Sequence, residues 1–391
     1  MRWHLAILPG DGIGPEVVEA TLQVLHATAE RFGHELVVDL KDVGWSAFEK
    51  NGTPLPEDTL IACRKADAVL LGAVGDPRSE GVPIELRPEA ALLTLRREMG
   101  CFANIRPVRL SSALSSASPL RPEIVEGTDL LIVRELSGGL YYGEPRGPTE
   151  DGQAAVDTMA YHRDEVARIA RVAFEASQNR RGKLLSVDKA NVLYCSRLWR
   201  QVVDEIAEEY PAVEFNHMLV DRAAMELVLN PTSFDVILTA NLFGDVLSDE
   251  AAAVVGSIGL LASASVGGGK GIFEPVHGSA PDIAGTGTAN PLAMILSAAM
   301  LLRHVYSLEA ESTAIEKAVD NGLNIGLRTA DLAREGETTV GTVQMAATIA
   351  ETIADAGTSY EGDTQGEEGF PHRDGTESGP ENGSHQVTAR A

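Results

Sequence analysis

The stretch FDVILTANLFGDVLSDE, residues 234–250, decides the fold class. Its first part is an apolar, β-branched run that ends at Thr239, and its second part has the residue spacing of a helix. A buried strand followed at once by a helix is the unit from which parallel α/β sheets are built. The sequence therefore predicts an α/β protein whose ligand site lies where such strands end.

Two carboxylates of the predicted helix, Asp245 and Asp249, are four residues apart. That spacing places them on one helix face, with their Cβ atoms about 5 to 6 Å apart. Two like charges so close are unfavourable unless a cation lies between them or one of them pairs elsewhere. Two interpretations stay open at this point, a solvated acidic turn and half of a site for Mg²⁺ or Mn²⁺, which prefer such oxygen ligands.

The chain has 391 residues, enough for two domains of ordinary size, and a formal net charge of −25. Such a charge argues against nucleic acid or an anionic membrane as the main partner. Only seven of the 32 basic residues are lysine, and we interpret this acid-rich, lysine-poor balance as adaptation to high salt. A halophilic source is thus a hypothesis, which thermal stability measured at low and at molar salt would test.

Three cysteines show no metal-ligand spacing, and the first residues contain no signal-peptide core, so we expect a cytoplasmic protein with reduced thiols. Residues 251–269 are uncharged but rich in Ala, Gly and Ser, which favours a buried helix with a glycine loop over a membrane span. Residues 356–391 carry almost no large apolar side chains, and we predict a disordered acidic tail there.

The patterning predicts further strands and helices along the chain. The expected strands are 3–8, 35–40, 66–72, 130–133, 183–187 and 214–220, and the expected helices are 15–33, 164–177, 291–302 and 338–354. Between the first strand and helix lies PGDGIGP, which fails the GxGxxG template because Pro15 occupies its last position. We therefore predict a tight turn with close backbone packing there and not a Rossmann fold.

Several polar residues follow predicted strands or line predicted helices. Arg96 lies on a helix, Arg106 at a break that we assign to Pro107, and Arg134 after a strand. Guanidinium groups in such positions could bind carboxylates, although a surface helix with local ion pairs fits Arg96 equally well. Lys189 is one of the few lysines, and Lys can lose a proton where Arg cannot. Asp221, after another strand, could instead be the plain N-cap of the next helix.

Seven motifs together resemble one family, the decarboxylating β-hydroxyacid dehydrogenases that include isocitrate and isopropylmalate dehydrogenases. They are LPGDGIGPEV, LLTLRRE, FANIRP, VRELSGGLYYGEPRG, SVDKANVL, NLFGDVLSDEAA and FEPVHGSAPDIAGTGTANP, spread over residues 3–350. The resemblance implies a non-Rossmann α/β fold of two domains with a sheet crossing between them. A cofactor-binding domain would comprise 1–101 plus 256–355, and a second domain, 102–255, would carry a dimer interface and an arm.

The resemblance also implies roles for individual residues. Arg96, Arg106 and Arg134 would hold the carboxylates of a malate, and Leu92 and Leu93 would form an apolar wall for an isopropyl group. Asp245 and Asp249, with Asp221 of the partner subunit, would hold one Mg²⁺ or Mn²⁺ in a homodimer with shared sites. Lys189 would accept the proton of the substrate C2 hydroxyl, and Tyr141, which by itself suggests only packing, would protonate the enolate carbon.

The implied reaction is NAD-dependent oxidative decarboxylation of 3-isopropylmalate to 2-oxoisocaproate in leucine biosynthesis. Asp282 matches the carboxylate that accepts hydrogen bonds from the adenosine ribose and would repel a 2′-phosphate. The full set of implied cofactor-binding residues is Glu89, His277, Gly278, Ser279, Ala280, Asp282, Ile283 and Asn290. Two alternatives stay open, a related dehydrogenase for homoisocitrate, isocitrate, tartrate or D-malate, and a non-catalytic acidic protein that binds divalent ions.

Overall fold

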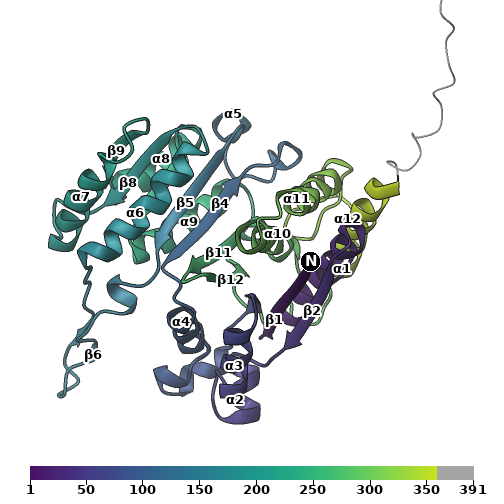
Figure 1. The fold of residues 1–391 in the computed structure, drawn as a ribbon, viewed down its shortest axis with the longest axis horizontal. Coiled ribbons are helices and arrows are strands. Elements are labelled where there is room, and N and C mark those ends of the chain that lie inside the picture. Colours follow the sequence, from purple (N-terminus) through teal and green to yellow (C-terminus); the bar gives the residue numbers. More distant parts are fainter. Residues whose placement is uncertain (359–391) are drawn as a thin grey trace, which may run out of the picture.

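The computed structural model describes residues 1–358, and it contains one large mixed sheet flanked by helices (Figure 1). The strand order is β2-β1-β3-β12-β11-β4-β5-β10-β8-β9. The strands are β1 (Arg2–Gly10), β2 (Glu35–Leu40), β3 (Ala68–Ala73), β4 (Ala103–Arg109), β5 (Asp129–Glu135), β8 (Lys183–Asp188), β9 (Glu214–Leu219), β10 (Val236–Thr239), β11 (Ala262–Gly267) and β12 (Lys270–Pro275). The α/β class predicted from residues 234–250 is confirmed.

The sheet consists of two parallel halves joined by antiparallel strands. In one half β2, β1, β3 and β12 run parallel, and in the other β5, β10, β8 and β9 do. Between them β11 pairs antiparallel with both β12 and β4, and β4 pairs antiparallel with β5. The predicted sheet that crosses between two halves of the molecule is thus present.

Helices cover both faces of each half. They are α1 (Gly14–Phe32), α2 (Trp45–Asn51), α3 (Glu57–Lys65), α4 (Pro88–Glu98), α5 (Pro122–Val125), α6 (Arg163–Gln178), α7 (Tyr194–Ala207), α8 (Val220–Leu229), α9 (Asn241–Val254), α10 (Leu292–Tyr306), α11 (Glu309–Asn324) and α12 (Thr342–Thr358). A short antiparallel pair, β6 (Gly147–Pro148) and β7 (Ala155–Val156), projects from the half that contains α6 and α7 (Figure 1).

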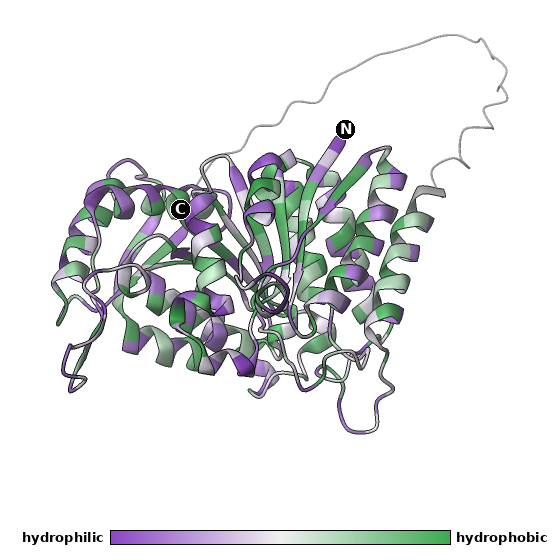
Figure 2. Cartoon of the chain, turned by 90° about the horizontal axis from the view of Figure 1, so that it is seen from below, coloured by the Kyte–Doolittle hydropathy of each residue, from purple (hydrophilic) through white to green (hydrophobic). Residues whose placement is uncertain are grey.

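Alternation along the strands explains why both faces are covered. In β10, Val236 and Leu238 pack in the core below α6 and α7, whereas Ile237 packs in the core below α8 and α9. Successive side chains of a strand point to opposite faces, so an unbroken apolar run requires cover on both sides. Figure 2 accordingly shows the strands between helices whose outer faces carry hydrophilic residues.

The glycine loop after β1 packs backbone against backbone, as predicted. Gly10 has φ +76°, and a Cβ there would lie 1.8 Å from the carbonyl oxygen of Ala73. A Cβ on Gly12 would lie 1.9 Å from the carbonyl oxygen of Ser279, which accepts a hydrogen bond from the N–H of Ile13 at 2.8 Å. The loop therefore joins the start of α1 to the segment after β12.

Three expectations about local structure were wrong. Residues 251–269 contain the end of α9 and the strand β11, whose Ala and Ser side chains suit the crowded centre of a sheet. Pro107 does not break the chain but lies within β4, beyond the residues of β4 that pair with β11, where its missing N–H costs no ladder bond. Helix α12 continues to Thr358, past the predicted helix end at residue 354, and the predicted tail from residue 359 onward lies outside the described part.

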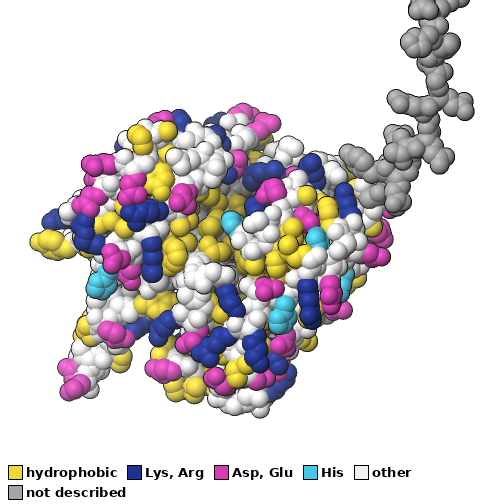
Figure 3. Space-filling model, viewed as in Figure 1, with side chains coloured by type: hydrophobic (Ala, Val, Ile, Leu, Met, Phe, Trp, Pro, Cys, Tyr) yellow, Lys and Arg dark blue, Asp and Glu magenta, His cyan; other side chains and the backbone are white. Residues whose placement is uncertain are grey.

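The predicted division into residues 1–101 plus 256–355 and 102–255 stays a prediction. Within residues 1–358, no helix combines the length and the apolar character that crossing a bilayer requires. On the face drawn in Figure 3, charged side chains are scattered and apolar side chains gather near the middle. A hollow of about 460 Å³ lies between β4 and β5 of one half and α10 and α11 of the other.

Candidate active site

The candidate site lies at the carboxyl ends of β5 and β10, next to the start of α9. Thr239, the last residue of β10, pairs in parallel register with Arg134 of β5. Helix α9 then begins at Asn241, so its first turns stand beside the Arg134 side chain. This is where open α/β sheets place ligands, as the sequence predicted.

Three buried guanidinium groups meet at this point. The exposed fractions of Arg96, Arg106 and Arg134 are 8%, 4% and 2%. They come from α4, β4 and β5, so the fold brings together residues that are far apart in the sequence. Burial and the charge of Arg134 lower the pKa of Arg106 to about 9. A buried group whose cationic form is disfavoured in this way is stabilised by an anion placed beside it.

The two aspartates of α9 pair with these cations. Asp245 forms an ion pair with Nη1 of Arg134, and its Oδ1 lies 3.5 Å from Nη2 of Arg106. Oδ1 of Asp249 lies 3.6 Å from Nη1 of Arg106. Burial opposes ionisation of Asp245, but Arg134, the Tyr141 hydroxyl and Arg106 outweigh it, and the pKa of Asp245 falls below its usual value. Asp245 is therefore a charged group of the site.

The Tyr141 hydroxyl donates a hydrogen bond to Oδ2 of Asp245 at 2.7 Å. Burial and this bond to a carboxylate raise the pKa of Tyr141 to about 12. The phenol is thus protonated at neutral pH and can donate a proton. Tyr141 was not assigned a role from its own sequence context, and only the resemblance indicated one.

A cavity of about 350 Å³ contains these groups and most of the predicted substrate contacts. Helix α4 contributes both apolar and charged side chains to the lining of this cavity. Its lining includes Leu92, Leu93, Arg96, Arg106, Arg134, Tyr141, Asp245, Glu89, His277 and Gly278. A mostly apolar cleft with a few convergent charged groups has the character of a small-molecule site.

The carboxylates fit a hard divalent cation only in part. Asp245 and Asp249 offer oxygen ligands on one helix face, which is the donor chemistry that Mg²⁺ and Mn²⁺ prefer. Among residues 1–358 of one chain, however, no group of three His, Cys, Asp or Glu side chains is placed to hold a metal ion. Asp245 and Asp249 therefore supply two of the three predicted metal ligands on one chain.

Lys189 and Asp221 lie together, in the turn after β8 and in the first turn of α8, and neither lines this cavity. Their side chains form an ion pair, and the hydrogen bond from Lys189 lowers the pKa of Asp221. Asp221 is not an N-cap, because Leu219 occupies that position. The simple capping interpretation of Asp221 is wrong, and both side chains are available to a neighbour.

The predicted cofactor loop is divided between two environments. His277 and Gly278 line the cavity, and Nε2 of His277 is buried without a hydrogen-bond partner in the described part of the chain. Asp282 is exposed on the surface. Asn290 is used internally, since its Oδ1 accepts the N–H of Leu292 at 3.0 Å at the start of α10. The unpaired His277 nitrogen and the open Gly278 backbone fit a ligand such as NAD at this end.

Two residues of the site were missed at first. Glu274 of β12 is 6% exposed and accepts a hydrogen bond from Nη2 of Arg96 at 2.7 Å. Asn241 is fully buried and accepts a hydrogen bond from Nε of Arg134 at 2.9 Å. The available signal was a charged or amide side chain at the end of an otherwise apolar strand.

Gly244 lies inside α9, where glycine normally weakens a helix. A Cβ at this position would lie 2.7 Å from Cγ and 2.8 Å from Cβ of Arg134, so the stem of that side chain occupies the space. We expect Gly244→Ala to displace Arg134 and to lower kcat/KM about 100-fold, although alanine favours a helix by roughly 1 kcal/mol. Steady-state kinetics of the variant will check this, and unchanged kcat/KM would contradict the packing argument.

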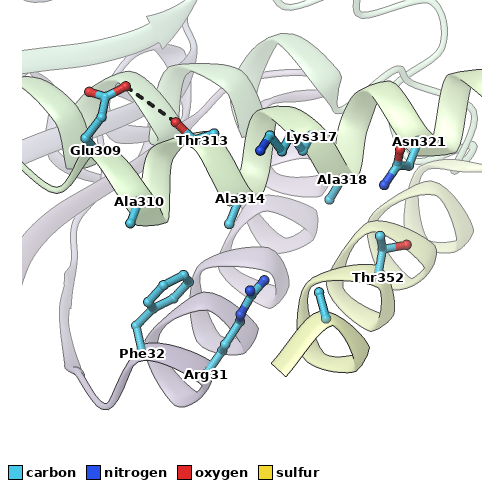
Figure 4. A pocket seen from close by; sticks show the side chains of 11 residues that line it. Arg31, Phe32, Glu309, Ala310, Thr313, Ala314, Lys317, Ala318, Asn321 and Thr352 are labelled. Carbon is cyan, nitrogen blue, oxygen red and sulfur yellow. Dashed lines mark hydrogen bonds between the residues drawn. The ribbon is translucent and has the colours of Figure 1, made fainter. Parts of the chain in front are cut away.

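A larger hollow, of about 630 Å³, lies far from these groups between α1, α11 and α12. Figure 4 shows Phe32 and Arg31 of α1 pointing toward Ala310 and Ala314 of α11. Its walls, within the described part of the chain, contain none of the predicted site residues. Volume alone therefore does not mark the site here.

Comparison with known proteins gives the family. The sequence profile described as "Isocitrate/isopropylmalate dehydrogenase" matches residues 4–349. The chain belongs to this family. As a member of the isocitrate/isopropylmalate dehydrogenase family, the protein is a decarboxylating dehydrogenase, and the resemblance carried by the seven motifs is confirmed.

Individual relatives of the family are similar over nearly their whole length. The chain is 54% identical over 349 residues to a 3-isopropylmalate dehydrogenase of Heyndrickxia coagulans, covering 88% of this chain and 95% of the relative. It is 51% identical to one of Aquifex aeolicus, covering 90% and 97%. Among solved structures, an isocitrate dehydrogenase from Methylococcus capsulatus matches with a TM-score of 0.80 at 37% identity, covering 90% and 99%.

Proposed function

We propose that the protein catalyses the NAD-dependent oxidative decarboxylation of 3-isopropylmalate, a step of leucine biosynthesis. The observation that carries the proposal is one cavity lined by three buried guanidinium groups, Asp245 and two leucines, with Asp249 paired to Arg106 beside it. The Heyndrickxia and Aquifex relatives, which bear the name of that activity, support it.

The charges of the cavity suit a doubly charged acid together with a divalent cation. Arg96, Arg106 and Arg134 contribute three positive charges, and Glu274, Asp245 and Asp249 contribute three negative ones. A dicarboxylate and a divalent cation would add equal and opposite charges, which keeps the buried cluster neutral. A dicarboxylate bound alone would leave two unbalanced negative charges, so we expect substrate and metal to bind together.

Leu92 and Leu93 of α4 provide the contact for the branched side chain. Both line the cavity and lie about one helical turn before Arg96 on the same short helix. Burying an isopropyl group there would contribute roughly 1 to 3 kcal/mol of discrimination. A third carboxylate, as in isocitrate, would meet the same apolar wall unpaired.

The chain's own residues supply the proton transfers. We propose that Lys189, delivered by the partner chain, accepts the C2 hydroxyl proton and that Tyr141 donates a proton to the enolate carbon. A bound Mg²⁺ or Mn²⁺ would supply Lewis-acid stabilisation of the developing oxyanion. The protonated state of Tyr141 and its contact with Asp245 support this role for Tyr141 next to a proposed cation ligand.

A homodimer would complete the site, because Asp221 and Lys189 have to reach the cavity from outside. The faces of α8 and α9 favour such an assembly. Large apolar side chains are exposed there, at Met225 (63%), Leu229 (63%) and Val246 (59%). An exposed apolar stripe on adjacent helices is typical of a helix-mediated subunit interface.

We propose NAD as the cofactor, bound by the loop after β12. The exposed carboxylate of Asp282 would accept hydrogen bonds from a ribose diol and repel a 2′-phosphate. The implied set also includes Glu89, Ser279, Ala280 and Ile283, of which Glu89 reaches the cavity. Small soluble metabolites as substrate and cofactor agree with the expected cytoplasmic location.

The test is NADH formation with 3-isopropylmalate, homoisocitrate, isocitrate, tartrate and D-malate, each with Mn²⁺ and KCl present. We expect the highest kcat/KM for 3-isopropylmalate, because only its side chain matches the leucine wall. Faster turnover of isocitrate or D-malate would contradict the proposed substrate while leaving the reaction class intact.

A further inference from the structure

We propose that Asn241 is the positioning residue that holds Arg134, the Tyr141 turn and the start of α9 in one arrangement. The inference rests on the proposed function of Arg134 and Tyr141 and assigns a role to a residue that touches neither substrate nor cofactor. Asn241 is fully buried at the junction of β10 and α9.

Three hydrogen-bonding groups of Asn241 bond to three different parts of the chain. Its Oδ1 accepts from Nε of Arg134 at 2.9 Å, and its Nδ2 donates to the carbonyl oxygen of Gly138 at 3.0 Å. Its backbone N–H donates to the hydroxyl oxygen of Tyr161 at 2.9 Å. The side-chain bonds require one acceptor and one donor side by side, which is the property of an amide.

The turn that Asn241 holds is the one that carries Tyr141. The short 3₁₀ segment Gly139–Tyr141 follows Gly138 directly. On its other side the turn packs closely on Tyr161, because a Cβ on Gly139 would lie 2.4 Å from the Tyr161 hydroxyl oxygen. The bond from Asn241 to Gly138 therefore fixes the start of the turn, and with it the direction in which Tyr141 points.

Two successive turns of α9 contact the same two parts of the chain, the Arg134 side chain and the turn that carries Tyr141. Asn241, in the first turn, bonds to Arg134 and to the Tyr141 turn. Asp245, one turn later, pairs with Arg134 and accepts a hydrogen bond from the Tyr141 hydroxyl. If a cation draws the Asp245 carboxylate toward itself, Asn241 still holds Arg134 and the Tyr141 turn. The neutral amide of Asn241 thus keeps both in place when Asp245 binds a cation.

The test is a double-mutant cycle with Tyr141. We expect Asn241→Ala to lower kcat for 3-isopropylmalate about 100-fold, since displacement of a reacting group by about 1 Å has that effect. In a Tyr141→Phe background the same change should lower kcat clearly less than 100-fold, because the loss that acts through Tyr141 is already present and only the loss through Arg134 is added. Equal losses in both backgrounds would indicate a general structural role and overturn the inference.

Hydrogen exchange gives a second measurement that needs no turnover. We expect faster amide exchange at residues 138–141 in Asn241→Ala, with Asn216→Ala on the exposed strand β9 as the matched control. Unchanged exchange at 138–141 would also overturn the inference. If Asn241→Ala does not fold, Asn241→Asp, which keeps the volume and loses the donor to Gly138, takes its place. If the unaltered protein does not oxidise 3-isopropylmalate, the proposed function fails, and hydrogen exchange still decides the role of Asn241.

Discussion

Replacement of Lys189 by alanine is expected to lower kcat by roughly 10²- to 10⁴-fold, the usual contribution of a general base. The side chain is 29% exposed and pairs only with Asp221 among the described residues, so its loss should leave the fold intact. KM for 3-isopropylmalate should change little, because the proposed clamp is formed by the buried arginines. Steady-state NADH formation and a thermal melt together measure both effects.

Lys183→Ala is the matched control for this change. Lys183 is an exposed lysine at the start of β8, the strand that Lys189 follows, and its Nζ lies 3.5 Å from a carboxylate oxygen of Glu214. Its removal should leave kcat within about 2-fold, since surface ion pairs contribute little. Retained turnover in Lys189→Ala would remove Lys189 from its proposed role. If Lys189→Ala still binds the cation but no longer turns over substrate, the result agrees with an enzyme. It does not agree with a simple ion-binding protein.

Purified mixed dimers of two inactive variants are expected to regain about half of the wild-type activity if the sites are shared, and the unfractionated mixture about a quarter. We consider Lys189→Ala in one chain and Asp245→Asn in the other. One site of the mixed dimer then receives both changes and the other receives neither. Random association makes half of the dimers mixed, and half of their sites are intact. Co-expression with two affinity tags and assay of each purified dimer measures this directly.

The control mixes Lys189→Ala with Asp221→Asn. Both residues lie in one chain and form an ion pair there, so they would enter the same site. Every site of such a mixed dimer contains one of the two changes, and activity should stay absent. Recovery in this control, or no recovery in the first mixture, would contradict the proposed shared sites.

The sheet could be predicted where strands carry large apolar and β-branched side chains and not where their side chains are small. Residues 234–250 predicted β10 and α9 because an apolar run and a helical spacing follow each other directly. Strand β11 was missed because Ala and Ser carry little strand preference, and its place depends on crowding by β4 and β12, which is a tertiary effect. The expected chain break at Pro107 was wrong for the same reason. Local sequence rules do not show which edge of β4 lacks a neighbouring strand.

The site could be predicted residue by residue only through the resemblance. Spacing relates Asp245 to Asp249 because they share a helix, but nothing local relates either of them to Arg106. The buried amide of Asn241 escaped notice because its partners, Arg134 and Gly138, are more than a hundred residues away. Such contacts arise from the register of β5 and β10, which the sequence alone does not reveal.

The antiparallel strands at the centre of the sheet also determine how the cavity can change its width. Arg96 stands on the half that contains β12, and Arg134 stands on the half that contains β5, with β11 and β4 between them. The backbone ladders of β11 with β4 and of β4 with β5 join the halves in one continuous sheet, so a change in its twist would change the distance between Arg96 and Arg134. The twist of β11 and β4 would therefore set how closely the two arginines can approach a bound substrate.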